Sequence, residues 1–462
     1  MALLRDFAKL IRTKNAGPFL LTVDIMFPDV ETYRHVANSG VLSVELMART
    51  FKVPAEVVKL FHYDPANAIK ITIPRPVTSG SPEDTDLFGG QQFAPLVDVV
   101  VPDMPATLSN HSGAEKMSKP ILRELVTDAT AWKGPDLQND TSWIYHLDAA
   151  DIEDLEYACE HVKREELRWG EFTKEQFPLP RLSAKLADID KQIRHGRGFV
   201  VIRGLPLNKY DNEQTRTLYW GLGAHLGQII SHNVKGDTMA PVTDLALKND
   251  DPNRRNNTTN QILDPHTDLA DVVMLLCIEK AKEGGISSLS SSVAIHNEIL
   301  KHHPEYLEVL YDGFYHDYRG YGPSGDPNEV TETRIPVFEY NNGRVNCAFA
   351  KKIIETGAQK HGIPLTALQQ AAIDYVHELA IREDMRIDMQ LEPGDIQIIN
   401  NYMTLHARTN YIDYDDGRKR YLLRMWVNLP DSMQLSPDFA KFVRRGIPAQ
   451  EKTTETSVGA VV

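Results

Sequence analysis

The sequence is short of cysteine, of long apolar runs and of positive charge, and each shortage excludes a class of protein. Its three cysteines, Cys159, Cys277 and Cys347, lie far apart without a Cys-x-x-Cys pair. This argues against a disulfide framework and a zinc–thiolate site, and it predicts a reducing compartment, the cytoplasm. No apolar run approaches the roughly 20 residues of a membrane span. The net charge of −14 argues against general binding to nucleic acid or anionic membranes.

Internal repeats are also missing, and the composition is that of an ordinary globular protein. Hydrophobic residues make up 42% and charged residues 25% of the chain, and its 462 residues are enough for two or three domains. The first 19 residues are mildly basic and amphipathic, as mitochondrial transit peptides are. However, they contain Asp6 and no serine, and they continue into a predicted strand. We therefore predict that they belong to the first domain.

Residues 1–105 are predicted to form a small α/β domain. Strands are expected at residues 19–27, 57–61 and 68–73, and helices at residues 29–38 and 43–50, the second with Ser43 as N-cap. A polar loop at residues 78–92 follows, whose Asp84, Asp86 and Gln91 are candidates for an activity of this domain. Solvation of a surface loop explains these residues equally well.

The rest of the chain is divided into a linker, a large domain and a tail. Residues 106–125 are polar and aperiodic, which is typical of a linker. Residues 126–435 form the large domain, and residues 436–462 are predicted to be a partly disordered tail. In the large domain we expect a strand at residues 198–203 and helix caps at Asp148, at Asp211 with Gln214, and at Thr366 with Gln369.

Two arginines lie on an otherwise apolar strand near the end of the large domain. They belong to a series of short elements: a buried strand at residues 396–399, His406 just past that strand, and a second strand at residues 420–427. Period-two alternation places Arg420 and Arg424 on one face of the second strand, beside Leu422 and Trp426. A buried arginine keeps its proton and must meet an anion. Two interpretations stay open: structural salt bridges, or the carboxylates of a bound diacid.

His266 and Asp268 begin a predicted metal site. They are two residues apart, so on a strand their side chains lie on the same face. With the distant His406 they make the two-histidine, one-carboxylate set of non-haem Fe(II) oxygenases, which leaves three metal positions for other ligands. Three other pairs have the same spacing: His146 with Asp148, His296 with Glu298, and His303 with Glu305.

Sequence context favours His266 and Asp268 over the other pairs. They are followed by a strand-like run at residues 272–278 and by a suitably placed later histidine. Asp148 is instead explained as a helix cap. Glu298 and Glu305 are expected in polar, helical surface segments.

The motifs of the large domain occur in a distinctive order. His266-Thr-Asp268 is followed by Gly284-Gly285-Ile286-Ser287 and, much later, by Gly394-Asp395, His406, Arg420 and Arg424. This order resembles the taurine/2-oxoglutarate dioxygenase (TauD/TfdA) family. The resemblance covers about residues 131–430 and includes the segments WKGPDLQNDTSWIYHL, GRGFVVIRGLP and DVVMLLCIEKAKEGGISSLSS. Residues 1–103 resemble a separate family of unknown function, which in bacteria is often encoded beside proteins like those of acyclic terpene utilisation.

The resemblance implies a fold and a role for each residue of the predicted site. The expected class is α+β, a double-stranded β-helix of the jelly-roll type with helices outside it, preceded by the small α/β domain. His266, Asp268 and His406 would bind Fe(II), and Arg420 would pair with the distal carboxylate of 2-oxoglutarate. Ser287 stands where the family usually has threonine and would donate its hydroxyl to the same carboxylate. Arg424 would reach the proximal carboxylate or an anionic substrate.

The implied reaction couples oxidative decarboxylation of 2-oxoglutarate by O2 to oxidation of a C–H bond of a small metabolite, usually hydroxylation. Asp268 argues against halogenation, whereas desaturation and ring closure stay open. The substrate pocket is expected to be lined by loops, residues 248–260 among them. The alternative is a binding or scaffolding protein whose N-terminal domain docks a partner enzyme. The same domain is the expected site of contact with a protein partner or with a second copy of the chain.

Overall fold

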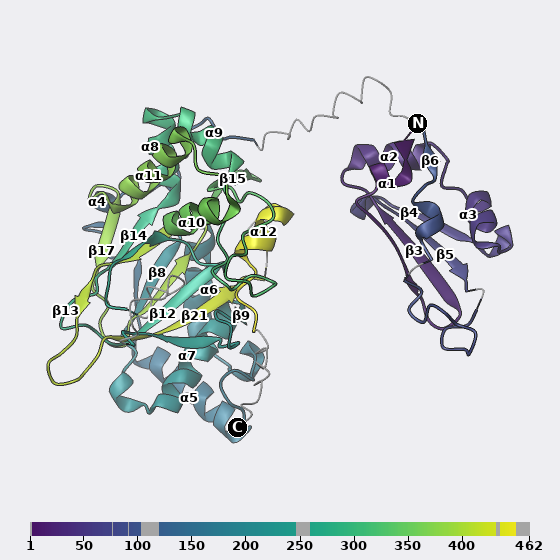
Figure 1. Cartoon of the computed structure of the whole chain (residues 1–462). Coiled ribbons are helices and arrows are strands. Elements are labelled where there is room, and N and C mark those ends of the chain that lie inside the picture. The colour runs from purple at the N-terminus through teal and green to yellow at the C-terminus, as the bar shows by residue number, and fades with distance from the viewer. Residues whose placement is uncertain are drawn as a thin grey trace, which may run out of the picture. The chain divides into compact units, whose positions relative to one another are not determined.

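The computed structural model describes residues 2–75, 77–90, 92–102, 120–245, 259–430 and 435–449. The chain divides into two compact units, Met1–Met117 and Ser118–Val462 (Figure 1), each with its own hydrophobic core. Residues 106–119 of the predicted linker and residues 450–462 of the predicted tail lie outside the described residues. In the described part of the chain, no helix has the length and apolar character that a membrane crossing requires.

The N-terminal unit is built on an antiparallel sheet with the strand order β2-β3-β5-β4. Its elements are β1 (Ala2–Leu3), α1 (Leu4–Phe7), β2 (Leu10–Asn15), β3 (Leu20–Met26), α2 (Val30–Asn38), α3 (Val44–Phe51), β4 (Lys59–Tyr63), β5 (Ala68–Pro74) and β6 (Val100–Val101), which pairs with β1. Val23 and Ile71 of the central strands share a buried core with Val36 of α2 and Met47 of α3. Helices therefore cover one face of this sheet. Strand β2, which the sequence analysis does not predict, forms one of its edges.

The polar loop at residues 78–92 is fixed by Arg75. The buried guanidinium of Arg75 pairs with Asp84 at 2.7 Å and donates to the backbone oxygen of Asp86 at 3.0 Å. Asp84 is therefore engaged in holding the loop, which favours the structural interpretation of this residue. Gln91 lies outside the described residues.

The large unit contains a seven-stranded and a four-stranded sheet. The larger has the order β10-β21-β12-β18-β8-β7, with β9 paired to β21, and the smaller has the order β11-β19-β14-β17. Neighbouring strands are antiparallel except for β7 and β8. The larger sheet consists of β7 (Ile144–His146), β8 (Phe199–Arg203), β9 (Gln228–Ile230), β10 (Met239–Val242), β12 (Val272–Glu279), β18 (Ile396–Asn400) and β21 (Tyr421–Asn428). The smaller consists of β11 (Leu263–His266), β14 (Ser287–Ser291), β17 (Arg386–Met389) and β19 (Thr404–Arg408).

Helices cover the outer face of the seven-stranded sheet. They are α5 (Ala149–Arg164), α6 (Leu182–His195) and α7 (Asn212–Leu226), drawn beside β12 and β21 in Figure 1. Strand β21 shows how alternation builds two cores: Leu423 and Met425 pack with these helices. Leu422 and Trp426, on the other face, pack in the interior with Leu289 of the smaller sheet. The predicted alternation of this strand is confirmed.

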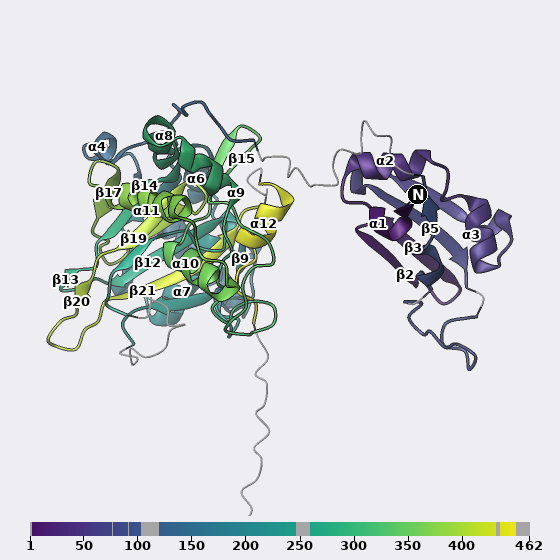
Figure 2. The same cartoon turned by 45° about the horizontal axis from the view of Figure 1, so that its top comes forward.

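A second group of helices lies outside the four-stranded sheet (Figure 2). Its members are α8 (Ser292–His302), α9 (Glu305–Asp312), α10 (Lys351–His361) and α11 (Ala367–Ile381). The unit also contains the short helix α4 (Gly134–Leu137) and two strand pairs, β13 (Glu283–Gly284) with β20 (Tyr411–Ile412) and β15 (Phe338–Asn341) with β16 (Arg344–Cys347). Helices outside two facing antiparallel sheets make the unit α+β and are consistent with the expected jelly-roll core.

The structure confirms the predicted helix caps and corrects two other expectations. The side chains of Asp148, Asp211 and Thr366 accept hydrogen bonds from backbone N–H groups in the first turns of α5, α7 and α11. Glu298, expected on a polar surface, is 5% exposed, because Lys133 and Arg382 pair with its carboxylate. Helix α12 (Pro437–Val443) follows the predicted domain end at residue 435, yet its Phe439 is part of the main core of the large unit. This unit therefore extends beyond the predicted boundary.

Candidate metal centre

The two candidate histidines come from neighbouring strands of the four-stranded sheet. His266 ends β11 and His406 lies in the middle of β19, and the two are cross-strand partners with ring centroids 4.2 Å apart. His406 is therefore in a strand of its own, since a tight turn at residues 401–403 separates β18 from β19. The sequence places it just past β18 because it gives no sign of this second strand. Asp268 lies in the loop from β11 to β12.

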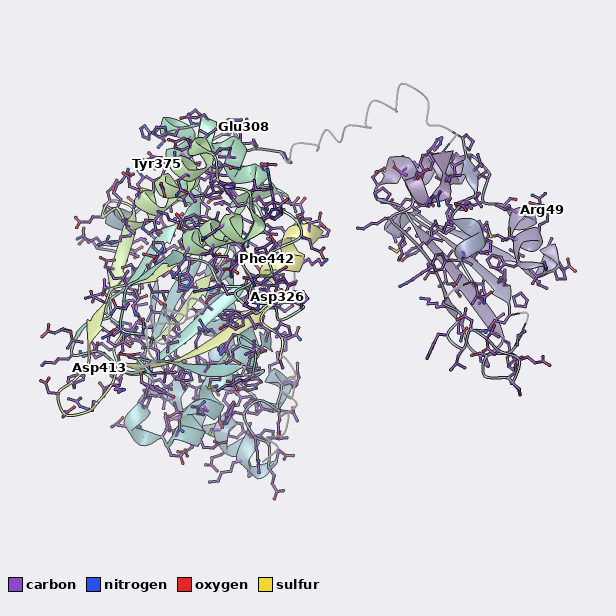
Figure 3. All side chains as sticks on the ribbon, in the orientation of Figure 1. Arg49, Glu308, Asp326, Tyr375, Asp413 and Phe442 are labelled. Carbon is purple, nitrogen blue, oxygen red and sulfur yellow. The ribbon has the colours of Figure 1, made fainter. Side chains whose placement is uncertain are left out.

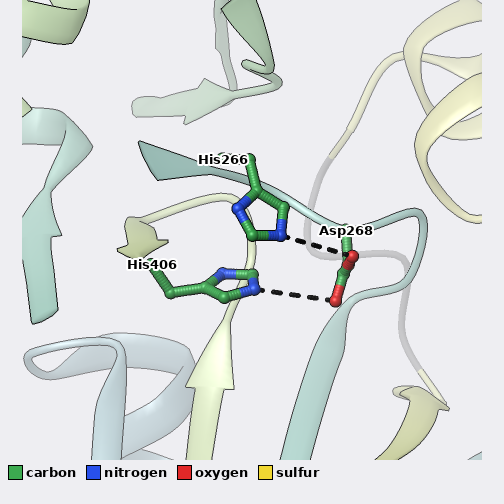
Figure 4. Close-up of side chains that lie close together, drawn as sticks. All are labelled: His266, Asp268 and His406. Atoms are coloured by element: carbon green, nitrogen blue, oxygen red, sulfur yellow. Dashed lines mark ion pairs between the residues drawn. The ribbon is translucent and has the colours of Figure 1, made fainter. Parts of the chain in front are cut away.

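The three side chains converge on one point (Figure 4). Nε2 of His266 lies 3.9 Å from Oδ1 of Asp268, and Nε2 of His406 lies 3.7 Å from Oδ2. The donor atoms all lie within 4.8 Å of one another, and no other group of three metal-binding side chains comes together in the described ranges. The other pairs with the same sequence spacing, such as His296 with Glu298, are not part of such a group.

The protonation states of this cluster suit a metal. Nδ1 of His266 is 2.8 Å from the backbone oxygen of Asp264, a contact that turns Nε2 towards Asp268. Burial alone would raise the pKa of Asp268, but Arg424, the two histidines and Trp426 lower it to about 2. Burial, assisted by His266, lowers the pKa of His406 to about 3. At neutral pH the cluster therefore offers an anionic carboxylate and a neutral His406 imidazole, as metal binding requires.

Two residues of β21 also contact Asp268. The indole N–H of Trp426 donates to Oδ2 at 3.0 Å, and Nη1 of Arg424 lies 3.9 Å from the same oxygen. The guanidinium of Arg424 lies over the Trp426 ring, 5.0 Å from its centroid. The predicted face of β21 thus reaches the metal site, and Trp426, which the sequence analysis places on this face without a role, orients the carboxylate.

Arg420 is buried without a counter-charge. No carboxylate of the described residues lies within ion-pair distance of its side chain, and its buried Nη1 has no hydrogen-bond partner. Burial lowers its pKa. The equally buried Arg408 also has an unpartnered Nη1, and the two guanidinium groups lie 5.2 and 4.9 Å from the ring centroid of Tyr411. Among the described residues Arg420 therefore has no structural salt bridge, which favours the second interpretation, the carboxylate of a bound diacid.

The glycine pair and Ser287 lie beside these arginines. Gly285 has a φ of +67°, and a Cβ atom there would be 2.8 Å from Nε of Arg420, so glycine lets the guanidinium approach. Ser287 is the cross-strand partner of Arg408, and its hydroxyl donates to Oε1 of Gln397 at 3.0 Å. The structure has no hydrogen bond between Ser287 and Arg420, so the predicted donor is engaged across the two sheets.

A cavity of about 180 Å³ opens onto the cluster. His266, Asp268, Arg424 and Trp426 line one side, and the C-terminal segment at residues 442–447 lines another. This segment includes Phe442 of α12, which is labelled in Figure 3, and Arg445, whose guanidinium lies 4.6 Å from the ring centroid of Tyr318. The sequence analysis assigns these residues to the tail, since no local pattern reveals that they return to the site. Residues 248–258 of the predicted pocket loop lie outside the described residues.

The donors present fit both a metal ion and a dicarboxylate. Two imidazole nitrogens and one carboxylate on one side of a centre are the ligand set of non-haem Fe(II) sites. The orphaned Nη1 of Arg420, with a glycine cradle beside it, is a place for a carboxylate oxygen.

Comparison with known proteins gives two family matches. The family "Taurine catabolism dioxygenase TauD, TfdA family" matches residues 163–426, and "Domain of unknown function (DUF4387)" matches residues 4–100. FR-33289 synthase of Streptomyces rubellomurinus is 30% identical over 339 residues, which cover 72% of this chain and 99% of that protein. The taurine hydroxylase-like protein SAT17 of Stachybotrys chartarum is 26% identical over 330 residues, 68% of this chain and 83% of that protein.

Solved structures show the same fold for the large unit. An asparagine oxygenase, determined in complex with Fe(II), 2S,3S-3-hydroxyasparagine and succinate, superposes with a TM-score of 0.51 and 17% identity. The superposition covers 66% of this chain and 99% of that one. At this identity the likeness concerns the fold alone.

Proposed function

The chain belongs to the taurine catabolism dioxygenase TauD, TfdA family and is a 2-oxoglutarate-dependent dioxygenase; on this basis we propose that His266, Asp268 and His406 bind its iron and that it hydroxylates a small metabolite. The observation that carries the residue assignment is the convergence of the three donor groups within 4.8 Å. Bound Fe(II) supplies oxidation of a C–H bond at the expense of O2 and 2-oxoglutarate, which becomes succinate and CO2. The loss of one carboxylate leaves succinate with the distal carboxylate intact.

The protein's own contribution at the metal is orientation. The backbone oxygen of Asp264 fixes the ring of His266, and the indole of Trp426 fixes the carboxylate of Asp268. In His266 the contact is made by the ring nitrogen that faces away from Asp268, and in Asp268 it is made by Oδ2, the oxygen 3.7 Å from Nε2 of His406. Contacts of this kind set the direction of metal ligands. The neutral state of His406 leaves its nitrogen available without prior loss of a proton.

Arg420 is the proposed anchor for the distal carboxylate of 2-oxoglutarate. Its guanidinium is buried and, among the described residues, has no carboxylate partner and no partner for Nη1, so a bound carboxylate would satisfy both its charge and its hydrogen-bond capacity. Arg408, whose guanidinium lies 4.9 Å from the ring centroid of the same Tyr411, adds positive potential near Arg420. Ser287 is the cross-strand partner of Arg408 in the proposed site, and its hydroxyl donates to Oε1 of Gln397.

The proposed substrate is a small metabolite with an anionic group. The cavity of about 180 Å³ is smaller than the roughly 300–1,000 Å³ that drug-sized ligands occupy. Arg424 and Arg445 both line it, and the carboxylate of the lining residue Asp317 is paired with Lys360 at 2.8 Å. Arg424 stands next to the metal donors, whereas Arg445 is presented by the C-terminal segment. An anionic group of the substrate bound between Arg424 and Arg445 would be held away from the substrate carbon that is oxidised.

The decisive experiment measures succinate formed from 2-oxoglutarate with Fe(II), ascorbate and O2 over a panel of small carboxylates and their amides. The wild type should form succinate, and His266→Ala should not. His302→Ala, at an exposed histidine of α8, serves as the control and should match the wild type. Equal inactivity of wild type and His266→Ala across the panel would instead support a binding or scaffolding role.

The N-terminal unit carries a second candidate function, docking of a protein partner. Phe19, Leu87 and Phe88 are 66%, 52% and 78% exposed. Hydrogen bonds from Ser79 to the backbone oxygens of Pro18 and Leu87 bring their two segments together. Clustered exposed apolar side chains favour an interaction surface. Light scattering of the full chain and of Phe88→Ser tests whether this surface joins two copies of the chain, in which case the substitution should lower the measured mass.

The proposed location is the cytoplasm. All three cysteines, Cys159, Cys277 and Cys347, are free thiols, and the last two are buried. Free thiols are typical of a reducing compartment. Mass spectrometry of the protein from its own cells, after rapid alkylation, should find all three cysteines alkylated, which means that they were reduced thiols in the cell.

A further inference from the structure

The turn at residues 401–403 is bound directly to the loop that carries Asp268. Asn401, the first residue of this turn, is fully buried. Its Oδ1 accepts from the backbone N–H of Asp268 at 3.0 Å, its Nδ2 donates to the backbone oxygen of Ala270 at 2.8 Å, and its own N–H donates to the backbone oxygen of Asp271 at 3.0 Å. One asparagine thus binds three residues of the metal loop, including the backbone of the metal-site aspartate itself.

Other residues hold the rest of this loop, including Gly446, whose N–H donates to the backbone oxygen of Leu269 at 3.0 Å. Before Asp268, Thr267 exchanges two hydrogen bonds with the backbone of Phe349, at 2.8 and 3.1 Å. After it, the buried carboxylate of Asp271 accepts from Tyr402 at 2.5 Å and from Arg444 at 2.8 Å. These contacts fix the ends of the loop. Among the described residues, the hydrogen bond from the backbone of Asp268 goes to Asn401.

The position of Asn401 in the chain gives this contact a consequence for the metal donors. His406 follows five residues later, on the strand that the turn introduces. Asn401 therefore joins the backbone of one donor residue to the strand of another, and Oδ2 of Asp268 lies 3.7 Å from Nε2 of His406. Metal sites need their ligands within about half an ångström of the productive geometry.

We propose that Asn401 is a positioning residue of the metal site, whose carboxamide sets the Asp268 carboxylate against Nε2 of His406. The proposal rests on the proposed function, since it assumes that these three side chains bind a metal. Without the carboxamide, the N–H of Asp268 and the oxygen of Ala270 are buried without partners, and the loop between its two fixed ends relaxes to satisfy them. The donor atoms then separate, and metal affinity falls while the ends of the loop stay in place.

The preceding residue provides a matched control. Asn400 is also fully buried, and its side chain makes equivalent bonds: Nδ2 donates to the backbone oxygen of Ile193 at 2.9 Å, and Oδ1 accepts from the N–H of Tyr402 at 2.8 Å. None of its side-chain hydrogen bonds reaches the metal loop. The two asparagines therefore differ in what they bind and agree in residue type, burial and neighbourhood.

The test compares Asn401→Leu with Asn400→Leu in the full chain. Two quantities are measured: the melting temperature of the metal-free protein, and the dissociation constant for Mn(II), followed by its electron paramagnetic resonance. We expect both variants to lower the melting temperature. Asn401→Leu should weaken Mn(II) binding about tenfold or more, the usual effect of removing an outer support of a metal ligand. Asn400→Leu should bind Mn(II) within about twofold of the wild type.

A second pair keeps the result interpretable if leucine is not tolerated. Asn401→Ala and Asn400→Ala leave space that a water molecule can occupy, so each is less disruptive. Equal Mn(II) affinities in the two variants would overturn the proposal. So would failure of both Asn401 variants to fold while both Asn400 variants fold, because Asn401 would then be a structural residue. Failure of the wild type itself to bind Mn(II) would refute the proposed function and is distinguishable from either result.

Discussion

His266 and His406 face one another across β11 and β19, with ring centroids 4.2 Å apart and both Nε2 atoms directed at the carboxylate of Asp268. Two imidazoles in such contact repel one another when protonated, and burial opposes the charged form of His406. A metal cation replaces those protons by one shared charge.

Replacing Trp426 by phenylalanine should weaken metal binding without disrupting the core. The change keeps an aromatic ring, although the phenyl group is smaller than the indole, and it removes the hydrogen bond of 3.0 Å to Oδ2 of Asp268. We expect Mn(II) affinity to fall by about tenfold, as measured by titration of the metal-free protein. Trp220→Phe is the control. The indole of Trp220 is also buried, but it donates to the backbone oxygen of Phe172, which is not part of the metal site. A similar loss of affinity in both variants would show that the effect is one of packing.

Replacing Arg420 by methionine should raise the 2-oxoglutarate requirement and leave metal content unchanged. The long apolar side chain fills the same space and removes the buried charge, so the metal-free protein should be as stable as the wild type or more stable. The KM for 2-oxoglutarate should rise by about 10–100-fold, the value of a charge-assisted hydrogen bond. Steady-state kinetics and metal analysis measure the two effects. Loss of bound iron in this variant is incompatible with the role proposed for Arg420.

Replacing Gly285 by alanine should act on the same co-substrate through Arg420. The new Cβ would lie 2.8 Å from Nε of Arg420, so the guanidinium must move. We expect a raised KM for 2-oxoglutarate and unchanged Mn(II) affinity. Gly343→Ala is the control, since Gly343 also has a positive φ, +80°, but no atom lies within 4 Å of its added Cβ. Each substitution costs about 1 kcal/mol of backbone strain. The difference between the two variants in the KM for 2-oxoglutarate therefore reports on Arg420.

Lowering the pH should destabilise the protein through its buried histidine His316. Burial, with the nearby charge of Arg445, lowers the pKa of His316 to about 3, whereas in the unfolded chain it is near 6.5. Between these values the unfolded state binds more protons, so the contribution is complete above about pH 6.5 and is lost as the pH falls. The loss approaches about 1.4 kcal/mol per pH unit.

Denaturant titrations of the metal-free protein at pH 7 and pH 5 measure this contribution. His316→Leu should have a smaller difference in unfolding free energy between the two pH values than the wild type. His146→Leu, at an exposed histidine, should keep the wild-type difference. If His316→Leu kept it as well, His316 would be excluded as its source.

Local patterns in the sequence reveal much of this molecule. Asp148, Asp211 and Thr366 are found as caps because a helix end needs a side-chain acceptor within three residues. The interior face of β21 is found because alternation is a property of the strand alone. His266 and Asp268 are predicted as metal ligands because they are two residues apart and His406 completes a known ligand set, but Asp268 lies in the loop after β11 and not on a strand as expected.

Other features depend on contacts between distant segments and leave no local trace. Asn401 and Asp268 are 133 residues apart in the sequence, and their hydrogen bond exists because β18 and β12 pair in one sheet. Arg445 lies beyond the last strand and reaches the cavity because α12 packs into the main core. That no carboxylate of the described residues forms an ion pair with Arg420 is likewise a property of the assembled interior. These contacts can be found only in the folded structure.

Whether His266, Asp268 and His406 bind the iron is tested most directly by a crystal structure of the full chain. The crystals are grown without oxygen in the presence of Fe(II) and 2-oxoglutarate, and anomalous data are collected at the iron edge. We expect one strong anomalous peak between His266, Asp268 and His406. We also expect density for the distal carboxylate of 2-oxoglutarate against the guanidinium of Arg420. An iron peak bound elsewhere, or a co-substrate whose distal carboxylate avoids Arg420, would contradict it.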